Sequence, residues 1–127
     1  MIEESILSRA KPKKVWRLWQ ESHQWDRKQG SFKVGQTGHA YSDKRKGSAF
    51  KIVSIEKNVS FTLEWRAPLV KIYMSHRVEP HERGSKIIYT FNLKGGLSYI
   101  LRPFLKKKIR KHLKQALNEF VAVLEGS

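Results

Sequence analysis

The sequence predicts an α+β domain in which a long C-terminal helix lies across a curved antiparallel sheet. Residues 97–124 show the apolar spacing of one helix face. Between residues 32 and 93, apolar residues alternate with polar ones in five segments joined by short turns. The length of 127 residues suits one domain with its own core, so we expect residues 1–127 to form a single domain.

The predicted C-terminal helix is amphipathic from Pro103 onward. A proline inside a helix removes one backbone donor, so we expect a kink or a new helix start there. The helix would be on the order of 40 Å long, at ~1.5 Å per residue, and would span a small domain. Its apolar stripe consists of Leu105, Ile109, Leu113, Ala116, Leu117, Phe120 and Leu124. The opposite face carries Lys107, Lys108, Lys111 and Lys114, with Arg110 to one side.

The remaining elements follow in chain order. A first strand is expected from Ile2 to Arg9, and Pro12 suits the first turn of a short helix with Val15, Trp16 and Trp19 on one face. A second short helix or turn is expected at residues 22–25. The later strands are expected at 32–41 (interrupted near residues 35–36), 50–55, 61–65, 70–79 and 87–93, with turns at 43–47, 56–58 and 80–84. This gives six strands, and two short helices after the first strand.

The charge is strongly positive, with 26 Lys plus Arg against 11 Asp plus Glu and a formal net charge of +15. Such a field favours nucleic acid, anionic membranes or acidic ligands as partners. The alternative, that the charge only keeps the protein soluble, stays open. The chain has no cysteine, which excludes disulfides and thiolate metal sites. A signal peptide and an apolar run of ~20 residues are both lacking, so we expect a cytoplasmic protein.

Several short motifs follow one another along the whole chain. They are Ala10, Pro12, Val15-Trp16, Trp25, Val34-Gly35-Gln36, Gly38, Ile55-Glu56, Leu63-Glu64, Glu79-Pro80, Gly84 to Ile87, Gly95 and the helix end near Glu125. In their order and spacing they resemble the START-related (SRPBCC) superfamily of polyketide cyclases, dehydrases and lipid-transport proteins. The sequence departs from that pattern at Ser8, where an apolar residue is expected, and in its basicity. The resemblance implies a helix-grip fold, with a sheet of six to seven strands around the helix and an apolar cavity between them.

The resemblance also implies binding or transport of a hydrophobic or amphipathic small molecule, lipid-like or polyketide-like. An apolar wall with a few polar groups suits such a ligand. The alternative, that the same side chains only fill a core, stays open. By strand alternation, one set of sheet residues could face the helix, and four helix residues are taken together with it as cavity candidates. The candidates are Phe61, Leu63, Trp65, Ile72, Met74, His76, Tyr89 and Phe91 on the sheet, and Phe104, Ile109, Leu113 and Phe120 on the helix.

His76 is the polar residue of most interest among these candidates. In a cavity it would hydrogen-bond a ligand or act as a general acid or base, with Tyr89 as a neighbour on the adjacent strand. The alternative is a core histidine whose nitrogens are satisfied by backbone or water. A cyclase-like or dehydrase-like activity of this pair follows only from the resemblance, and catalysis is not favoured.

Familiar catalytic and metal-binding patterns do not occur in the sequence. There is no cysteine nucleophile, His-Glu-x-x-His, phosphate-binding loop or Gly-x-Ser-x-Gly elbow. The five histidines lack ligand spacing, so we expect neither a metal nor a cofactor.

The second alternative function is binding of an anionic surface without a ligand cavity. Clustered lysines and arginines contact phosphates of lipid headgroups or of nucleic acid. No nucleic-acid recognition motif accompanies the charge, so a membrane surface is the preferred partner of the two. The candidate basic surface consists of Lys44, Arg45, Lys46, Lys107, Lys108, Arg110, Lys111 and Lys114.

Overall fold

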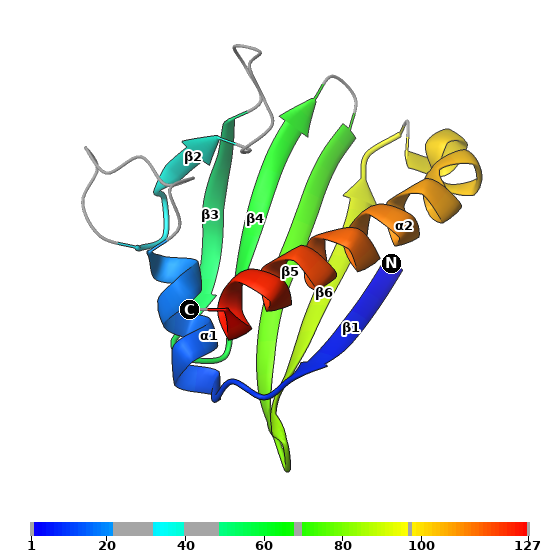
Figure 1. Ribbon diagram of the computed structural model, residues 1–127. Coiled ribbons are helices and arrows are strands. Elements are labelled where there is room, and N and C mark those ends of the chain that lie inside the picture. The colour runs from blue at the N-terminus through cyan, green and yellow to red at the C-terminus, as the bar shows by residue number, and fades with distance from the viewer. Residues whose placement is uncertain (1, 22–31, 40–48, 68–69, 97, 127) are drawn as a thin grey trace.

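The computed structural model describes residues 2–21, 32–39, 49–67, 70–96 and 98–126. In these ranges six strands form one antiparallel sheet in the order β1-β6-β5-β4-β3-β2. Figure 1 shows a curved open sheet with α2 crossing one face, which confirms the expected α+β architecture. The elements are β1 (Ile2–Ser8), α1 (Pro12–Gln20), β2 (Thr37–His39), β3 (Ala49–Glu56), β4 (Ser60–Ala67), β5 (Val70–His81), β6 (Gly84–Lys94) and α2 (Ser98–Glu125).

The segment before β2 differs from the strand expected from residue 32. Gly35 adopts a φ of 93°, and the Gln36 backbone N–H donates to the Lys33 carbonyl at 3.1 Å, so the chain turns here. The turn is joined to β3, because Ile52 exchanges hydrogen bonds with Gly35 and Gln36 at 2.8 and 2.9 Å. Regular pairing begins only at Thr37. The expected second helix at 22–25 and the hairpin at 43–47 lie outside the described residues.

Pro80 lies inside β5, although the sequence predicted a turn at residues 80–84. The Val78 backbone N–H donates to the Val59 carbonyl at 2.8 Å, on the side of β4. Backbone nitrogens of alternate strand residues face the same side, so the Pro80 nitrogen faces β4 as well. Because β4 begins only at Ser60, opposite Arg77, the missing donor of Pro80 removes no ladder hydrogen bond. The strand therefore continues to His81, and the turn is confined to residues 82–83.

The C-terminal helix α2 runs unbroken through Pro103, so the alternative of a new helix start there is wrong, and the kink stays a prediction. The helix packs mainly over β1 and β6. Its inner face buries Leu113, Leu117 and Leu124. The smaller helix α1 buries Val15, Trp16 and Trp19, as their spacing predicted.

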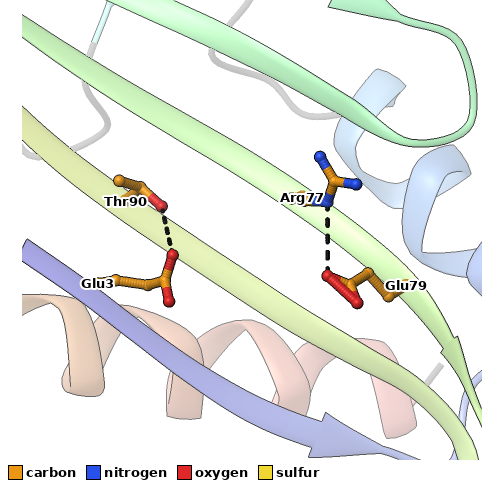
Figure 2. Close-up of polar contacts among 4 residues, drawn as sticks. All are labelled: Glu3, Arg77, Glu79 and Thr90. Atoms are coloured by element: carbon orange, nitrogen blue, oxygen red, sulfur yellow. Dashed lines mark hydrogen bonds and ion pairs between the residues drawn. The ribbon is translucent and has the colours of Figure 1, made fainter.

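The two faces of the sheet differ in polarity because side chains alternate along each strand. The face beneath the helices carries the core. On the other face, Thr62 and Ser75 on neighbouring strands share a hydrogen bond of 3.0 Å. Figure 2 shows two further contacts: Thr90 donates to Glu3 at 3.5 Å, and Arg77 pairs with Glu79 at 3.5 Å. Because these contacts lie on the face turned away from the helices and are exposed, they stabilise the fold little.

The end of α2 is fixed to the connection between β1 and α1. The Ser8 hydroxyl donates to Glu125 Oε2 at 2.8 Å, and the Arg9 backbone N–H donates to the same oxygen at 3.0 Å. Both bonds lower the pKa of Glu125, and the bond from Arg9 has the larger effect. The Ser85 hydroxyl donates to the Ala10 carbonyl at 2.6 Å and ties β6 to the same point. Ser8, which replaces the apolar residue expected from the resemblance, is buried here as a donor to the helix end.

Candidate functional site

The strand register places the predicted cavity residues of the sheet on one face. Residues directly opposite each other on neighbouring strands point their side chains to the same side. The register therefore forms three rows beneath the helices. They are Phe61, His76 and Tyr89; Leu63, Met74 and Phe91; and Trp65 with Ile72.

The end of this face near α1 is filled by an aromatic cluster, which consists of Trp16, Trp19, Phe61, His76, Tyr89 and Phe120. The His76 ring stacks on Phe61 with centroids 4.4 Å apart and planes 4° apart, and lies 4.6 Å from Tyr89. Trp19 stacks on Phe120 of α2 at 5.6 Å. Rings at these separations are in contact. At this end Trp16, Trp19, Phe61 and Tyr89 are buried, and His76 and Phe120 are partly buried against them.

His76 and Tyr89 are both held neutral by burial. Burial lowers the pKa of His76 to about 3, against a weaker opposite effect of the Met74 backbone. Its Nδ1 is buried without a well-formed hydrogen bond to any described residue. Burial also raises the pKa of Tyr89 to about 12, and a hydrogen bond with the Trp19 side chain opposes that shift. Near pH 7 both neutral side chains can donate or accept hydrogen bonds, but a histidine with this low pKa is a weak general base.

The other end of the face is more open. We use the term open patch for five partly exposed apolar residues, contributed by three strands and by α2. They are Trp65, Ile72, Met74, Phe91 and Ile109. The Trp65 ring packs against buried Phe50 at 5.2 Å, which fixes one border of the patch. The helix α2 packs mainly on β1 and β6 rather than on β4 and β5, the strands that carry Trp65, Ile72 and Met74.

The helix residues named from the sequence divide in the same way. Leu113 is buried, whereas Ile109 and Phe120 are partly buried. Phe104 is 79% exposed, so its inclusion in the cavity wall is wrong. Leu113 follows Phe104 by nine residues, which is about two and a half turns at ~3.6 residues per turn. The two side chains therefore lie on opposite sides of the helix.

Glu4 is a charged residue of this face that the sequence analysis missed. It lies opposite Tyr89 in the register, and therefore points toward α2. Arg110 Nη1 lies 2.9 Å from Glu4 Oε1, and the Glu4 side chain is only 15% exposed. Alternation of Ile2, Glu4 and Ile6 was the available signal, because it places a carboxylate on the apolar side of β1.

The basic surface expected from the sequence is described only in part. Lys107, Lys108, Lys111 and Lys114 are exposed, whereas Arg110 is engaged with Glu4. Lys44, Arg45 and Lys46 lie outside the described residues. Across the described ranges, no three His, Asp or Glu side chains gather as a possible metal site, and no helix is long and apolar enough to cross a membrane.

Comparison with known proteins adds evidence on the fold. No family model matches the sequence, and no curated protein matches it significantly. SA2116 from Staphylococcus aureus, a protein of unknown function, superposes with a TM-score of 0.72 at 12% identity, over 98% of this chain and 93% of that one. DynU16, from the dynemicin biosynthetic locus, superposes with a TM-score of 0.70 at 11% identity, over 98% of this chain and 46% of that one. CalU16 from Micromonospora echinospora superposes with a TM-score of 0.64 at 11% identity, over 96% of this chain and 72% of that one. At these identities the likeness shows the fold alone, and the chain shares with these proteins a helix-grip-like α+β fold.

Proposed function

We propose that this domain binds a hydrophobic or amphipathic small molecule at the open patch. The observation that carries the proposal is the contrast between the two ends of one apolar face. The end near α1 is filled by rings in mutual contact, most of them buried, whereas all five members of the open patch stay partly exposed beside α2. Exposed apolar surface next to a few polar groups suits a small-molecule site.

The polar groups beside the patch favour a ligand with a neutral hydrogen-bonding group at its inner end. His76 follows Met74 on the same face of β5, and His76 and Tyr89 are neutral near pH 7. A carbonyl or phenol suits such partners better than a buried carboxylate or amine, because a buried charge needs a counter-charge. A polyketide-like or lipid-like molecule meets this description, and the dynemicin-locus neighbour supports the first class. We propose binding rather than catalysis, because neutral His76 is a weak base.

The test compares two tryptophan substitutions on adjacent residues of β5. Met74→Trp fills the open patch, whereas Ser75→Trp adds the same side chain to the face turned away from the helices. We expect Met74→Trp to weaken the binding of anilinonaphthalene sulfonate, an amphipathic fluorescent probe, at least tenfold. Ser75→Trp should keep the wild-type affinity. Cooperative thermal unfolding of both variants establishes that each is folded.

Native mass spectrometry of the protein purified through high salt provides the natural counterpart. An added mass of a few hundred daltons, present in Ser75→Trp and absent in Met74→Trp, would identify a bound molecule. Equal probe affinity in the two folded variants contradicts the proposed site.

A further inference from the structure

The first half of α2 presents a face that the fold leaves uncovered. Phe104, Lys107, Lys108 and Lys111 follow the i, i+3, i+4, i+7 spacing that places side chains on one side of a helix. We call this set the outward basic face. All four side chains are exposed, Phe104 to 79%. The buried leucines of α2 lie on the opposite side, so the outward basic face contributes nothing to the core.

The charges of this face are not compensated locally. No Asp or Glu occurs anywhere from residue 83 to residue 118. Among the described residues, the ion pairs involve Arg77 with Glu79 and Arg110 with Glu4, and none of the three lysines takes part. The nearest acidic residue of the helix, Glu119, accepts a hydrogen bond from Gln115 at 3.2 Å. The three lysines therefore leave their positive charge facing solvent.

We propose that the outward basic face docks on an anionic membrane surface. Lysines on one side of a helix attract anionic headgroups, and an aromatic side chain among them enters the boundary between headgroups and acyl chains. A nucleic acid would use the lysines equally well. However, a single convex helix offers no groove to hold a strand, and among the α2 side chains that the structure describes, Phe104 is the one ring exposed for stacking. The exposed phenylalanine beside the charges therefore favours a lipid surface.

Docking in this way would bring the open patch close to the membrane. The patch member Ile72 lies opposite Leu93, near the end of β6, and α2 begins just after that strand. Figure 1 shows the start of α2 at this end of the sheet. A ligand drawn from the lipid phase would then have a short path to the patch. The docking proposal itself stands on the helix alone and does not depend on a bound ligand.

The experiment measures co-sedimentation with sucrose-loaded vesicles of phosphatidylcholine, with and without about 30 mole per cent of the anionic lipid phosphatidylglycerol. We expect binding only to the anionic vesicles, weakening steeply with salt. The triple variant K107E/K108E/K111E should bind at least tenfold more weakly. The control K13E/K57E/R83E changes net charge equally at exposed residues outside α2, and should lose less than threefold.

A second pair of variants tests the aromatic contribution. Phe104→Ser should weaken vesicle binding several-fold, whereas Val34→Ser, which alters another exposed apolar residue, should not. Equal losses in the two triple variants would overturn the proposal, because total charge would then explain the binding. An oligonucleotide that binds through the same three lysines, with no vesicle binding, would overturn it in favour of nucleic acid. Met74→Trp should dock normally, which separates this proposal from the small-molecule site.

Discussion

Replacement of His76 by phenylalanine is expected to remove much of the acid sensitivity of the fold. His76 lies in the aromatic cluster, stacked on Phe61 at 4.4 Å, and burial lowers its pKa to about 3. In the unfolded chain its pKa returns to about 6.5. Below that value the unfolded state binds a proton that the folded state excludes. Protonation therefore favours unfolding.

The sign and size of the effect follow from proton linkage. The free energy of unfolding keeps its full value above pH 6.5 and falls by about 1.4 kcal/mol for each pH unit below it, until the folded pKa is reached. At pH 4.5 the wild-type protein should have lost about 3 kcal/mol through this residue alone. In His76→Phe that part of the slope disappears, and stability at pH 7 changes little because the stacked ring is kept and the unpartnered Nδ1 is removed. Urea unfolding between pH 7.5 and 4.5 measures the difference.

His112→Phe is the matched control, because it makes the same substitution at an exposed position of α2. It should keep the wild-type pH dependence. If the stability of the wild type and of His76→Phe changed with pH in the same way, the pKa of His76 would not differ between the folded and unfolded chains. His76 would then not be held neutral by burial. The remaining slope in every variant includes Glu125, whose lowered pKa also makes its contribution to stability decline on acidification.

The substitution Gly84→Ala should destabilise the protein more than Gly35→Ala or Gly96→Ala. Gly84 begins β6 with a φ of 140°, and a Cβ atom there would lie 2.4 Å from the Ser8 carbonyl oxygen and 2.6 Å from the carbonyl of Arg9. Those atoms are backbone, and the nearby hydrogen bond of Ser85 to Ala10 fixes them. Strain of this kind costs ~1–3 kcal/mol for the dihedral angle alone, and the overlap adds to it. We expect a loss of about 3 kcal/mol or more in urea unfolding.

Two other glycines separate the two causes. Gly35 has a φ of 93° but open space around its would-be Cβ, so Gly35→Ala should cost only the conformational part, about 1 kcal/mol. Gly96 has open space and no positive φ, so Gly96→Ala should be close to neutral. If Gly84→Ala cost no more than Gly35→Ala, close contact with the Ser8 and Arg9 backbone would not be what requires glycine at this position.

The sequence predicted those parts of the fold that local spacing determines. Alternation along residues 70–79 identified the side chains of β5 that face the helices, and the register then aligned His76 with Tyr89 as expected. The three-residue and four-residue spacing of Val15, Trp16 and Trp19 identified the buried side of α1. In each case the signal extended over several residues and outweighed any single exception.

The features that the sequence did not predict depend on what a neighbouring element does. Pro80 continues β5 only because β4 has not yet begun on that side. Ser8 is buried because the last residue of α2, 117 positions later, accepts its hydrogen bond. Phe104 was named as a cavity residue, although its helical spacing from Leu113 places it on the opposite side of α2. The openness of the patch depends on where α2 crosses the sheet, which no local pattern encodes.

The strand order has a consequence for how the chain folds during synthesis. Strands β2 to β6 pair with their neighbours in sequence, so each can join the sheet as the ribosome releases it. The first strand cannot join the sheet at once, because its only described partner is β6. Ile2 can pair only after Phe91 has been synthesised. Contacts that join the two ends of a chain close the longest loops and slow folding. Although β1 is made before the other described strands, it should therefore be among the last to join the sheet.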